Sequence, residues 1–206
     1  MALKYLGRAA DVGARALKYA RVERERRFLL RELPRGLREA DEHLQIFDNY
    51  ITGTRLRLRK VRAPRAREWT WKLTQKYAPA PPDFSRTLIT NLYLSQYEYE
   101  TLSVFEGNEL RKNRYPFEHE GRRYSVDVFL GRLRGLVLAE TDFETDEEMD
   151  AFTPPPFALM EVTRDELFTG ARLVELTAED LRRELARRDA DAASRRTEDE
   201  ELTNEA

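Results

Sequence analysis

Residues 22–30 read Val-Glu-Arg-Glu-Arg-Arg-Phe-Leu-Leu, and the fold depends on how this stretch is interpreted. In a β-strand, successive side chains point to opposite faces, so Glu23, Glu25 and Arg27 would share one face. Two carboxylates about 7 Å apart along one strand can share a divalent cation. A helix is the alternative, because Glu23 and Arg27 have the i,i+4 spacing of a surface ion pair. The later segments decide between the two.

Residues 55–59 alternate more clearly, because Arg55, Arg57 and Arg59 are separated by Leu56 and Leu58. This period of two predicts a strand with one apolar face and one face of three guanidiniums. An edge strand with a solvated basic face is compatible with the same pattern. Three like charges on one face repel each other unless an anion lies opposite, however, and this cost favours phosphate binding.

Similar strand patterns follow along the chain in residues 69–77, 86–94, 109–117, 124–130 and 136–143. The charged residues assigned to one face of these segments are Lys72, Lys76, Arg86, Lys112, Arg114, Asp127, Glu140 and Asp142. Because almost every strand has one charged face, we predict an α+β fold, an antiparallel β-barrel with a charged lumen and flanking helices.

Two helices are predicted beside these strands. Ser95 and Glu98 have the spacing of a capping box, which predicts a helix over residues 95–105. A closing helix is predicted from Thr163 to about Arg188, with a restart after a kink at Thr177.

The two ends of the chain differ from the predicted barrel domain, which covers residues 21–188. Residues 1–20 predict a basic amphipathic helix, either packed on the domain or lying on a membrane surface. Residues 189–206 are charged with little that is apolar, so they are predicted to be disordered.

Composition excludes several classes of protein. The chain has 206 residues, with 36 Lys and Arg against 38 Asp and Glu, so both signs are available for local fields. It contains no cysteine and two histidines, which argues against thiolate metal sites and histidine-dependent triads. No apolar run approaches the roughly 18 residues of a membrane span, and no signal peptide is recognisable, so we expect a cytoplasmic protein. Trp69 and Trp71 fall on an apolar strand face, so stacking platforms for nucleic acid are not indicated.

An ordered series of motifs over residues 22 to 175 resembles the CYTH family, also called triphosphate tunnel metalloenzymes. The family hallmark is a Glu-x-Glu-x-Lys strand, which here reads Glu23, Glu25 and Arg27 at alternate positions. The remaining motifs of the series follow in order: Tyr50 before Arg55, Arg57 and Arg59; Thr74 and Lys76; Lys112, Arg114 and Tyr115; Asp127 and Phe129; Gly135 and Leu136; Glu140 and Asp142; Glu161 and Thr163.

The resemblance implies an antiparallel barrel tunnel that binds triphosphate compounds together with Mg²⁺ or Mn²⁺. The implied activity is metal-dependent hydrolysis of inorganic tripolyphosphate or a nucleoside triphosphate. A non-catalytic polyphosphate- or nucleotide-binding module and a class IV adenylyl cyclase are the alternatives. A homodimer is left open, as is an internal ion-pair network without catalysis.

Roles for individual residues follow from the resemblance and from the chemistry of a triphosphate, which needs several cations along its length. The candidate metal ligands are Glu23, Glu25, Glu140 and Asp142. The candidate triphosphate-binding residues are Arg55, Arg57, Arg59, Lys72, Lys76, Arg86, Lys112 and Arg114. The candidate catalytic residues are Arg27 and Tyr50, which would position the attacking water, and Asp127, which would complete the metal shell or orient the nucleophile.

Three positions depart from the family pattern. Arg27 replaces the lysine of the hallmark, and a guanidinium keeps the phosphate contact but cannot act as a base. Leu88 and Ser125 stand where carboxylates are common in the family. The acidic lining is therefore reduced, which weakens the case for turnover and for a second metal more than the case for phosphate binding.

Overall fold

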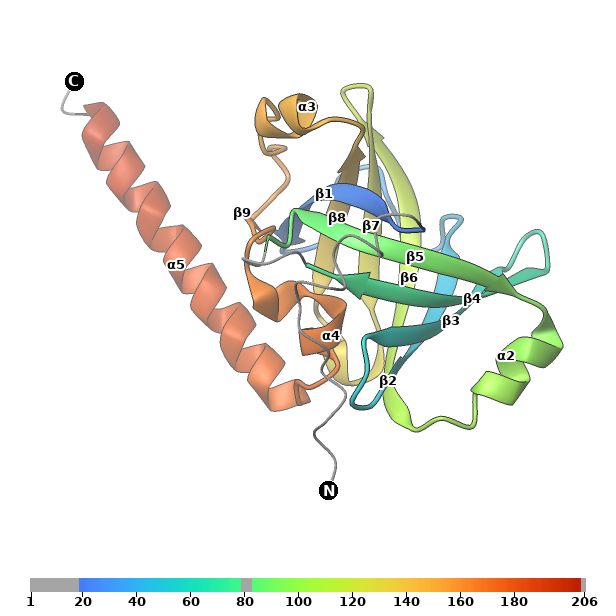
Figure 1. Cartoon of the computed structure of the whole chain (residues 1–206). Helices are drawn as coiled ribbons and strands as arrows, with labels where there is room; N and C mark the ends of the chain where they lie inside the picture. Colours follow the sequence, from blue (N-terminus) through green and yellow to red (C-terminus); the bar gives the residue numbers. More distant parts are fainter. Residues whose placement is uncertain (1–18, 79–82, 205–206) are drawn as a thin grey trace, which may run out of the picture.

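The computed structural model describes residues 19–78 and 83–204. Eight strands form a closed antiparallel barrel in the spatial order β1-β5-β4-β3-β2-β6-β7-β8 and back to β1 (Figure 1). The strands are β1 (Arg21–Leu30), β2 (Leu44–Ile51), β3 (Leu56–Ala63), β4 (Glu68–Tyr77), β5 (Arg86–Leu94), β6 (Gly107–His119), β7 (Arg122–Phe129) and β8 (Val137–Phe143). The predicted fold class, an antiparallel barrel with flanking helices, is confirmed.

Strand β1 closes the barrel, so the helical alternative for residues 22–30 is wrong. On one edge it pairs with β8, and on the other its first residues pair with β5. The rest of that second edge pairs through Phe28 and Leu29 with the short strand β9 (Met160–Glu161). The register with β8 sets Glu25 opposite Asp142, which brings the two acidic segments of the sequence side by side.

The hairpin predicted at Gly121 joins β6 to β7. Glu120 and Gly121 both have left-handed backbone angles, with φ of 50° and 73°. A two-residue turn with positive φ at both positions matches the twist of the strands that it connects. This turn sets the register in which Arg114 lies opposite Asp127.

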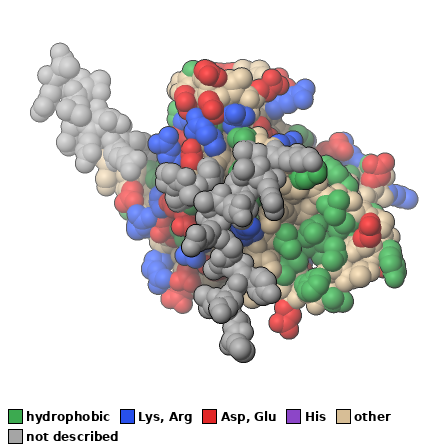
Figure 2. Space-filling model, in the orientation of Figure 1, with side chains coloured by type: hydrophobic (Ala, Val, Ile, Leu, Met, Phe, Trp, Pro, Cys, Tyr) green, Lys and Arg blue, Asp and Glu red, His purple; other side chains and the backbone are tan. Residues whose placement is uncertain are grey.

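The inserted helix is confirmed as α2 (Gln96–Leu102), with the capping box between Ser95 and Glu98 in place. None of its residues is buried. Figure 2 shows exposed hydrophobic side chains gathered on this side of the molecule, where Leu92, Tyr93 and Tyr97 are each more than half exposed. This face therefore contributes little to the core.

The single closing helix predicted from Thr163 is wrong. The chain instead makes the 3₁₀ turn η2 (Glu166–Phe168), the short helix α4 (Gly170–Leu173) and the long helix α5 (Ala178–Asn204). The Thr163 hydroxyl accepts the backbone N–H of Arg27 at 2.9 Å, so this residue ties the segment to β1 rather than capping a helix. Thr177 does restart the helix, because its hydroxyl accepts the backbone N–H of Asp180.

Helix α5 runs along one side of the barrel and projects beyond it (Figure 1). It extends to Asn204, so the disorder predicted from residue 189 differs from the structure. Ion pairs explain part of the difference: Arg187 binds Glu184 and Asp191 one helical turn away, and Arg31 binds Asp189. The helix predicted over residues 1–20 lies almost entirely outside the described residues.

The core has two parts. One cluster lies on the outside of the barrel, includes Phe28, Tyr115 and Val126, and packs against Phe152 and Phe157 of the segment that follows α3 (Asp146–Asp150). The other combines Leu29, Leu110, Phe129 and Leu138 with residues of η1 (Gly131–Leu133), η2, α4 and α5. Each of these four residues lies on the same face of its strand as the inward charged residues of β1, β6, β7 and β8. The C-terminal segment thus packs on the apolar continuation of the charged faces.

Among the described residues, no helix is both long enough and apolar enough to cross a membrane.

Candidate active site

The lumen contains a cavity of about 490 Å³ that is lined by all eight strands and by the segment 166–172. All but two of the predicted site residues line it: Glu23, Glu25, Arg27, Tyr50, Arg55, Arg57, Arg59, Lys72, Lys76, Lys112, Arg114, Glu140 and Asp142. Alternation along the strands therefore brought residues more than 100 positions apart into one enclosure. The two exceptions are Arg86 and Asp127.

Arg86 lies outside the barrel, which corrects its prediction as a triphosphate ligand. It lies opposite Arg24 in the pairing of β5 with β1, on the outward phase of both strands. Its Nε donates to Asp146 at 2.8 Å, and its Nη2 donates to Asp150 at 3.1 Å. The residues of β5 that line the cavity are Thr87, Ile89 and Asn91. A shift of one residue reverses the face of a strand, and Arg86 falls on the wrong phase.

Asp127 faces inward but lies behind the cavity wall, which corrects its predicted contact with the metal or the nucleophile. Its exposed fraction is 0%. It accepts hydrogen bonds from Nε and Nη2 of Arg114, each at 2.6 Å, and from Nζ of Lys112. Its oxygens are therefore used to hold two cations of the lumen.

Four carboxylates form the acidic wall of the cavity, where β1 lies beside β8. Burial raises the pKa of Asp142, and the neighbouring Glu25, Glu23 and Glu140 raise it further. No ion pair of Asp142 is found among the described residues. A carboxylate that is crowded by three others, in an oxygen-only donor set, suits a hard divalent cation.

Three of these carboxylates, Glu23, Glu25 and Glu140, are bound to lumen cations in the structure. Lys76 Nζ donates to Glu23 at 2.7 Å and to Glu25 at 3.0 Å. Arg27 binds Glu25 and Glu140, and its Nη1 donates to the carbonyl of Phe168 at 3.1 Å. Over residues 19–78 and 83–204, no group of three or more His, Cys, Asp or Glu side chains is arranged to hold a metal ion. A metal at this wall therefore requires the carboxylates to turn away from Lys76 and Arg27.

Arg27 stays protonated in this setting and cannot act as a general base. Although burial opposes its charge, Glu25 and Glu140 raise its pKa above the ordinary value for arginine. Its side chain is 7% exposed, and its guanidinium spans the two acidic strands. The residue acts as a clamp on the acidic wall and not as a proton acceptor.

The opposite wall of the cavity is lined by lysine and arginine side chains, among them Arg57, Arg59 and Lys72. Burial lowers the pKa of Lys72 to about 8, and the nearby Arg59 and Arg57 contribute. No carboxylate is paired with Lys72 in the part of the chain that the structure describes. The Nε atom of Arg57 is buried without a hydrogen-bond partner. Unsatisfied cationic donors in an enclosed space favour an anionic ligand.

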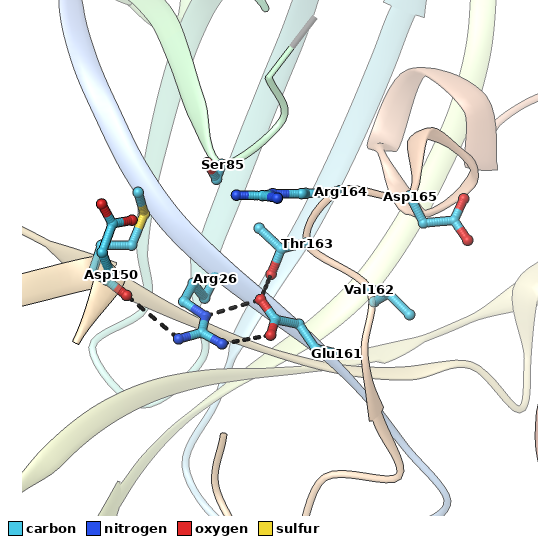
Figure 3. A pocket seen from close by; sticks show the side chains of 9 residues that line it. Arg26, Ser85, Asp150, Glu161, Val162, Thr163, Arg164 and Asp165 are labelled. Carbon is cyan, nitrogen blue, oxygen red and sulfur yellow. Dashed lines mark hydrogen bonds and ion pairs between the residues drawn. The ribbon is translucent and has the colours of Figure 1, made fainter. Parts of the chain in front are cut away.

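A second cavity, of about 410 Å³, lies outside the lumen and is lined by Arg26, Glu161 and Thr163 among others (Figure 3). Arg26 Nε donates to Glu161 at 2.9 Å, and its Nη1 contacts the carbonyls of Met149 and Phe152. Asp165, at the edge, is bound by Arg188. Most of the charge here is neutralised within the fold, so we place the chemistry in the lumen.

Sequence analysis missed several residues that shape the site. Glu166, Thr169, Gly170 and Arg172 line the cavity from the C-terminal segment. Asp48 supports it from behind, with an exposed fraction of 2%. The only sequence signal for Asp48 was its place two residues before Tyr50, because its partner Arg59 becomes visible only in the β2–β3 register.

Gly170 allows α4 to lie against Tyr50. A Cβ atom at Gly170 would lie 1.8 Å from the Tyr50 Oη, which is too close for two non-bonded atoms. We expect Gly170→Ala to destabilise the protein by about 1–3 kcal/mol, as overpacking typically does. Thermal unfolding measures this, and adding Tyr50→Phe should restore part of the loss because it removes the nearest atom. A melting temperature unchanged by Gly170→Ala would contradict the close contact.

The chain is similar in sequence to two inorganic triphosphatases. No protein-family model matches it. It is 36% identical to the inorganic triphosphatase of Acetivibrio thermocellus over 96 residues, which are 42% of this chain and 60% of that protein. It is 32% identical to the inorganic triphosphatase of Nitrosomonas europaea over 102 residues, 44% of this chain and 68% of that protein.

A solved structure described as the hypothetical protein NE1496 superposes with a TM-score of 0.51 at 25% identity, covering 75% of this chain and 99% of that one. The match to the Acetivibrio protein spans less than two thirds of that protein's length, whereas the match to the Nitrosomonas protein exceeds two thirds. On the sequence match over this larger share, the chain belongs to the same protein family as the inorganic triphosphatase of Nitrosomonas europaea.

Proposed function

We propose that the protein is a metal-dependent triphosphate hydrolase of the triphosphate tunnel metalloenzyme type, acting on inorganic tripolyphosphate or a nucleoside triphosphate in the barrel lumen. The observation that carries this proposal is that one cavity sets a wall of arginines and lysines, of which Lys72 has no carboxylate partner among the described residues, against a wall of four carboxylates. The names of the two relatives favour inorganic tripolyphosphate as the substrate.

The basic wall would bind the phosphate chain. Arginine suits this task because its planar guanidinium contacts two phosphate oxygens at once. Nε of Arg57 has no hydrogen-bond partner, and no carboxylate is paired with Lys72 among the described residues, while Lys112 and Arg114 are held by Asp127. The lumen thus offers cations along its length, as a linear anion requires.

The acidic wall would hold Mg²⁺ or Mn²⁺ through Glu23, Glu25, Glu140 and Asp142. Their carboxylate oxygens are the donor atoms that these ions prefer. When bound, such an ion would supply Lewis-acid chemistry, which would offset negative charge on the phosphate chain and make water a stronger nucleophile. Lys76 and Arg27 would then release these carboxylates and remain beside them as cations of the lumen. Tyr50, which lines the same cavity beside Arg57, would help to position the attacking water.

A substrate screen with the purified full chain tests the proposal. Tripolyphosphate, ATP and thiamine triphosphate are each incubated with and without Mg²⁺ or Mn²⁺, and phosphate release is measured. We expect metal-dependent release from at least tripolyphosphate. Binding by calorimetry without release from any substrate would instead identify a non-catalytic binding module. Cyclic AMP and pyrophosphate formed from ATP would identify an adenylyl cyclase.

Lys72 predicts the pH dependence of binding. In the free protein it loses its proton around pH 8, and a bound anion would raise its pKa toward the ordinary value for lysine. Binding above pH 8 then takes up a proton, so affinity for tripolyphosphate is expected to fall by up to about tenfold per pH unit above pH 8. Below pH 8 this contribution is already complete and the affinity should level off.

Calorimetry at a series of pH values, in two buffers of different ionisation enthalpy, measures both the affinity and the proton uptake. Lys72→Arg is the matched control, because a guanidinium stays charged throughout this range. The control should lose the fall in affinity above pH 8, while any titration of the ligand itself remains. An identical pH profile in both proteins would contradict the role of Lys72.

A further inference from the structure

Asp48, on β2, is the second buried anion behind the basic wall. Its Oδ1 accepts Nε of Arg59 at 2.5 Å, and its Oδ2 accepts Nη2 of the same guanidinium at 2.6 Å. Nε of Arg57 lies 3.6 Å from Oδ1. Although burial opposes its charge, Arg59 and Arg57 hold the pKa of Asp48 down to about 2. The residue does not line the cavity, so it is an ionised carboxylate that reaches a ligand only through these two arginines.

The arrangement repeats one found elsewhere in the barrel. Asp127, on β7, lies behind Lys112 and Arg114, which are two residues apart on the neighbouring strand β6. Asp48 lies behind Arg57 and Arg59, which are two residues apart on β3. In both cases one fully or almost fully buried aspartate faces two inward cations of an adjacent strand.

We propose that Asp48 is a positioning residue for triphosphate binding, which fixes Arg59 and its neighbour Arg57 with their remaining donors toward the lumen. The inference rests on the proposed function. A guanidinium has five N–H donors, and Asp48 takes two of those on Arg59, which leaves three for phosphate. Without the carboxylate, two like charges repel each other, and the long side chains must be ordered when the ligand arrives.

The sign of the change in affinity separates this role from two simpler ones. If Asp48 were only a countercharge, its removal would take a negative charge away from an anion site and strengthen binding. If it only stabilised the fold, the affinity of the folded protein would not change. A positioning role predicts weaker binding even though the lumen becomes more positive.

Asp48→Asn is the test, with the dissociation constant for metal-free tripolyphosphate measured by calorimetry on the full chain. The amide keeps the shape, but its NH₂ group meets the donors of Arg59. We expect binding to weaken by about tenfold, the lower end of the loss seen when a group that supports a ligand-holding side chain from behind is removed. Asp189→Asn removes an exposed carboxylate that is paired with Arg31 and should leave affinity unchanged.

The same substitution in an Arg59→Ala background shows whether the effect passes through Arg59. There the loss caused by Asp48→Asn should shrink to less than about threefold, because interacting residues are not additive. Unchanged or tighter binding by Asp48→Asn would overturn the proposal, as would a full tenfold loss in the Arg59→Ala background. Wild-type protein that does not bind tripolyphosphate would instead reject the proposed function.

Circular dichroism at the assay temperature establishes that the variants are folded. If Asp48→Asn does not fold, Asp48→Glu tests the same geometry, because the longer side chain keeps the charge but shifts the carboxylate that holds Arg59. A loss of about tenfold in Asp48→Glu supports positioning, and unchanged affinity overturns it.

Discussion

Replacing Glu23 and Glu25 together by glutamine is expected to abolish metal-dependent phosphate release, with a loss on the order of 100-fold or more, while the protein stays folded. The change keeps side-chain shape and removes two of the four carboxylates of the acidic wall. After burial, these two carboxylates contribute most to raising the pKa of Asp142, so the double variant loses the crowding that makes this wall attractive to a cation.

The structure adds an expectation for the same variant in the absence of metal. Lys76 would lose both of its carboxylate partners, and Arg27 would retain only Glu140. Cations left without partners in a partly enclosed lumen destabilise the fold, so the melting temperature should fall. Metal-free tripolyphosphate should bind more tightly than in the wild type, because the anion replaces the missing charges, and it should restore the melting temperature.

The control is Glu118→Gln with Glu120→Gln, which removes two exposed carboxylates at the same spacing near the β6–β7 hairpin. Phosphate release and melting temperature should both stay close to wild type. A well-folded Glu23→Gln, Glu25→Gln variant that retains metal-dependent activity would refute the metal-binding role of these glutamates.

The strands and the charged lumen were predictable because a period of two is a local signal. Arg55, Arg57 and Arg59 fix the phase of β3 by themselves, whereas positions 23–27 of β1 are all charged, so its interpretation as a strand depended on the later segments. The prediction put Arg86 on the wrong face of β5. That strand has one charged residue in nine, so no second charge shows which face points inward. Its outward direction follows from the pairing with Arg24, which is long-range information.

Alternation predicts the face of a strand but not the depth of a side chain. Asp127 shares the inward phase of β7, yet Lys112 and Arg114 cover it because their side chains are longer and converge on it from β6. Asp48 was missed for a related reason, since its function depends on a partner 11 residues away across the β2–β3 turn. The contact of Gly170 with Tyr50 joins segments 120 residues apart, a separation that local sequence patterns do not report.

The largest effect on binding is expected for Arg57→Ala. Arg57 lines the cavity, and its buried Nε has no hydrogen-bond partner. Although burial opposes its charge, Asp48 and Tyr50 raise its pKa, so it is a permanent cation on the basic wall. Hydrogen bonds to charged groups contribute about 1.5–3 kcal/mol, which corresponds to a loss of affinity for tripolyphosphate of roughly 10- to 100-fold.

Arg62→Ala provides the control, because Arg62 is an exposed arginine of the same strand β3 that lies against the ring of Trp69 outside the cavity. Its affinity should match wild type within about twofold, since surface substitutions usually act within ±0.5 kcal/mol. Calorimetry at low and high salt measures both variants. Affinity should fall as salt rises, but less steeply than for an open surface, because an enclosed site is screened less. Equal affinities of Arg57→Ala and wild type would show that the ligand does not contact this wall, and the phosphate chain would then have to lie along Lys112 and Arg114.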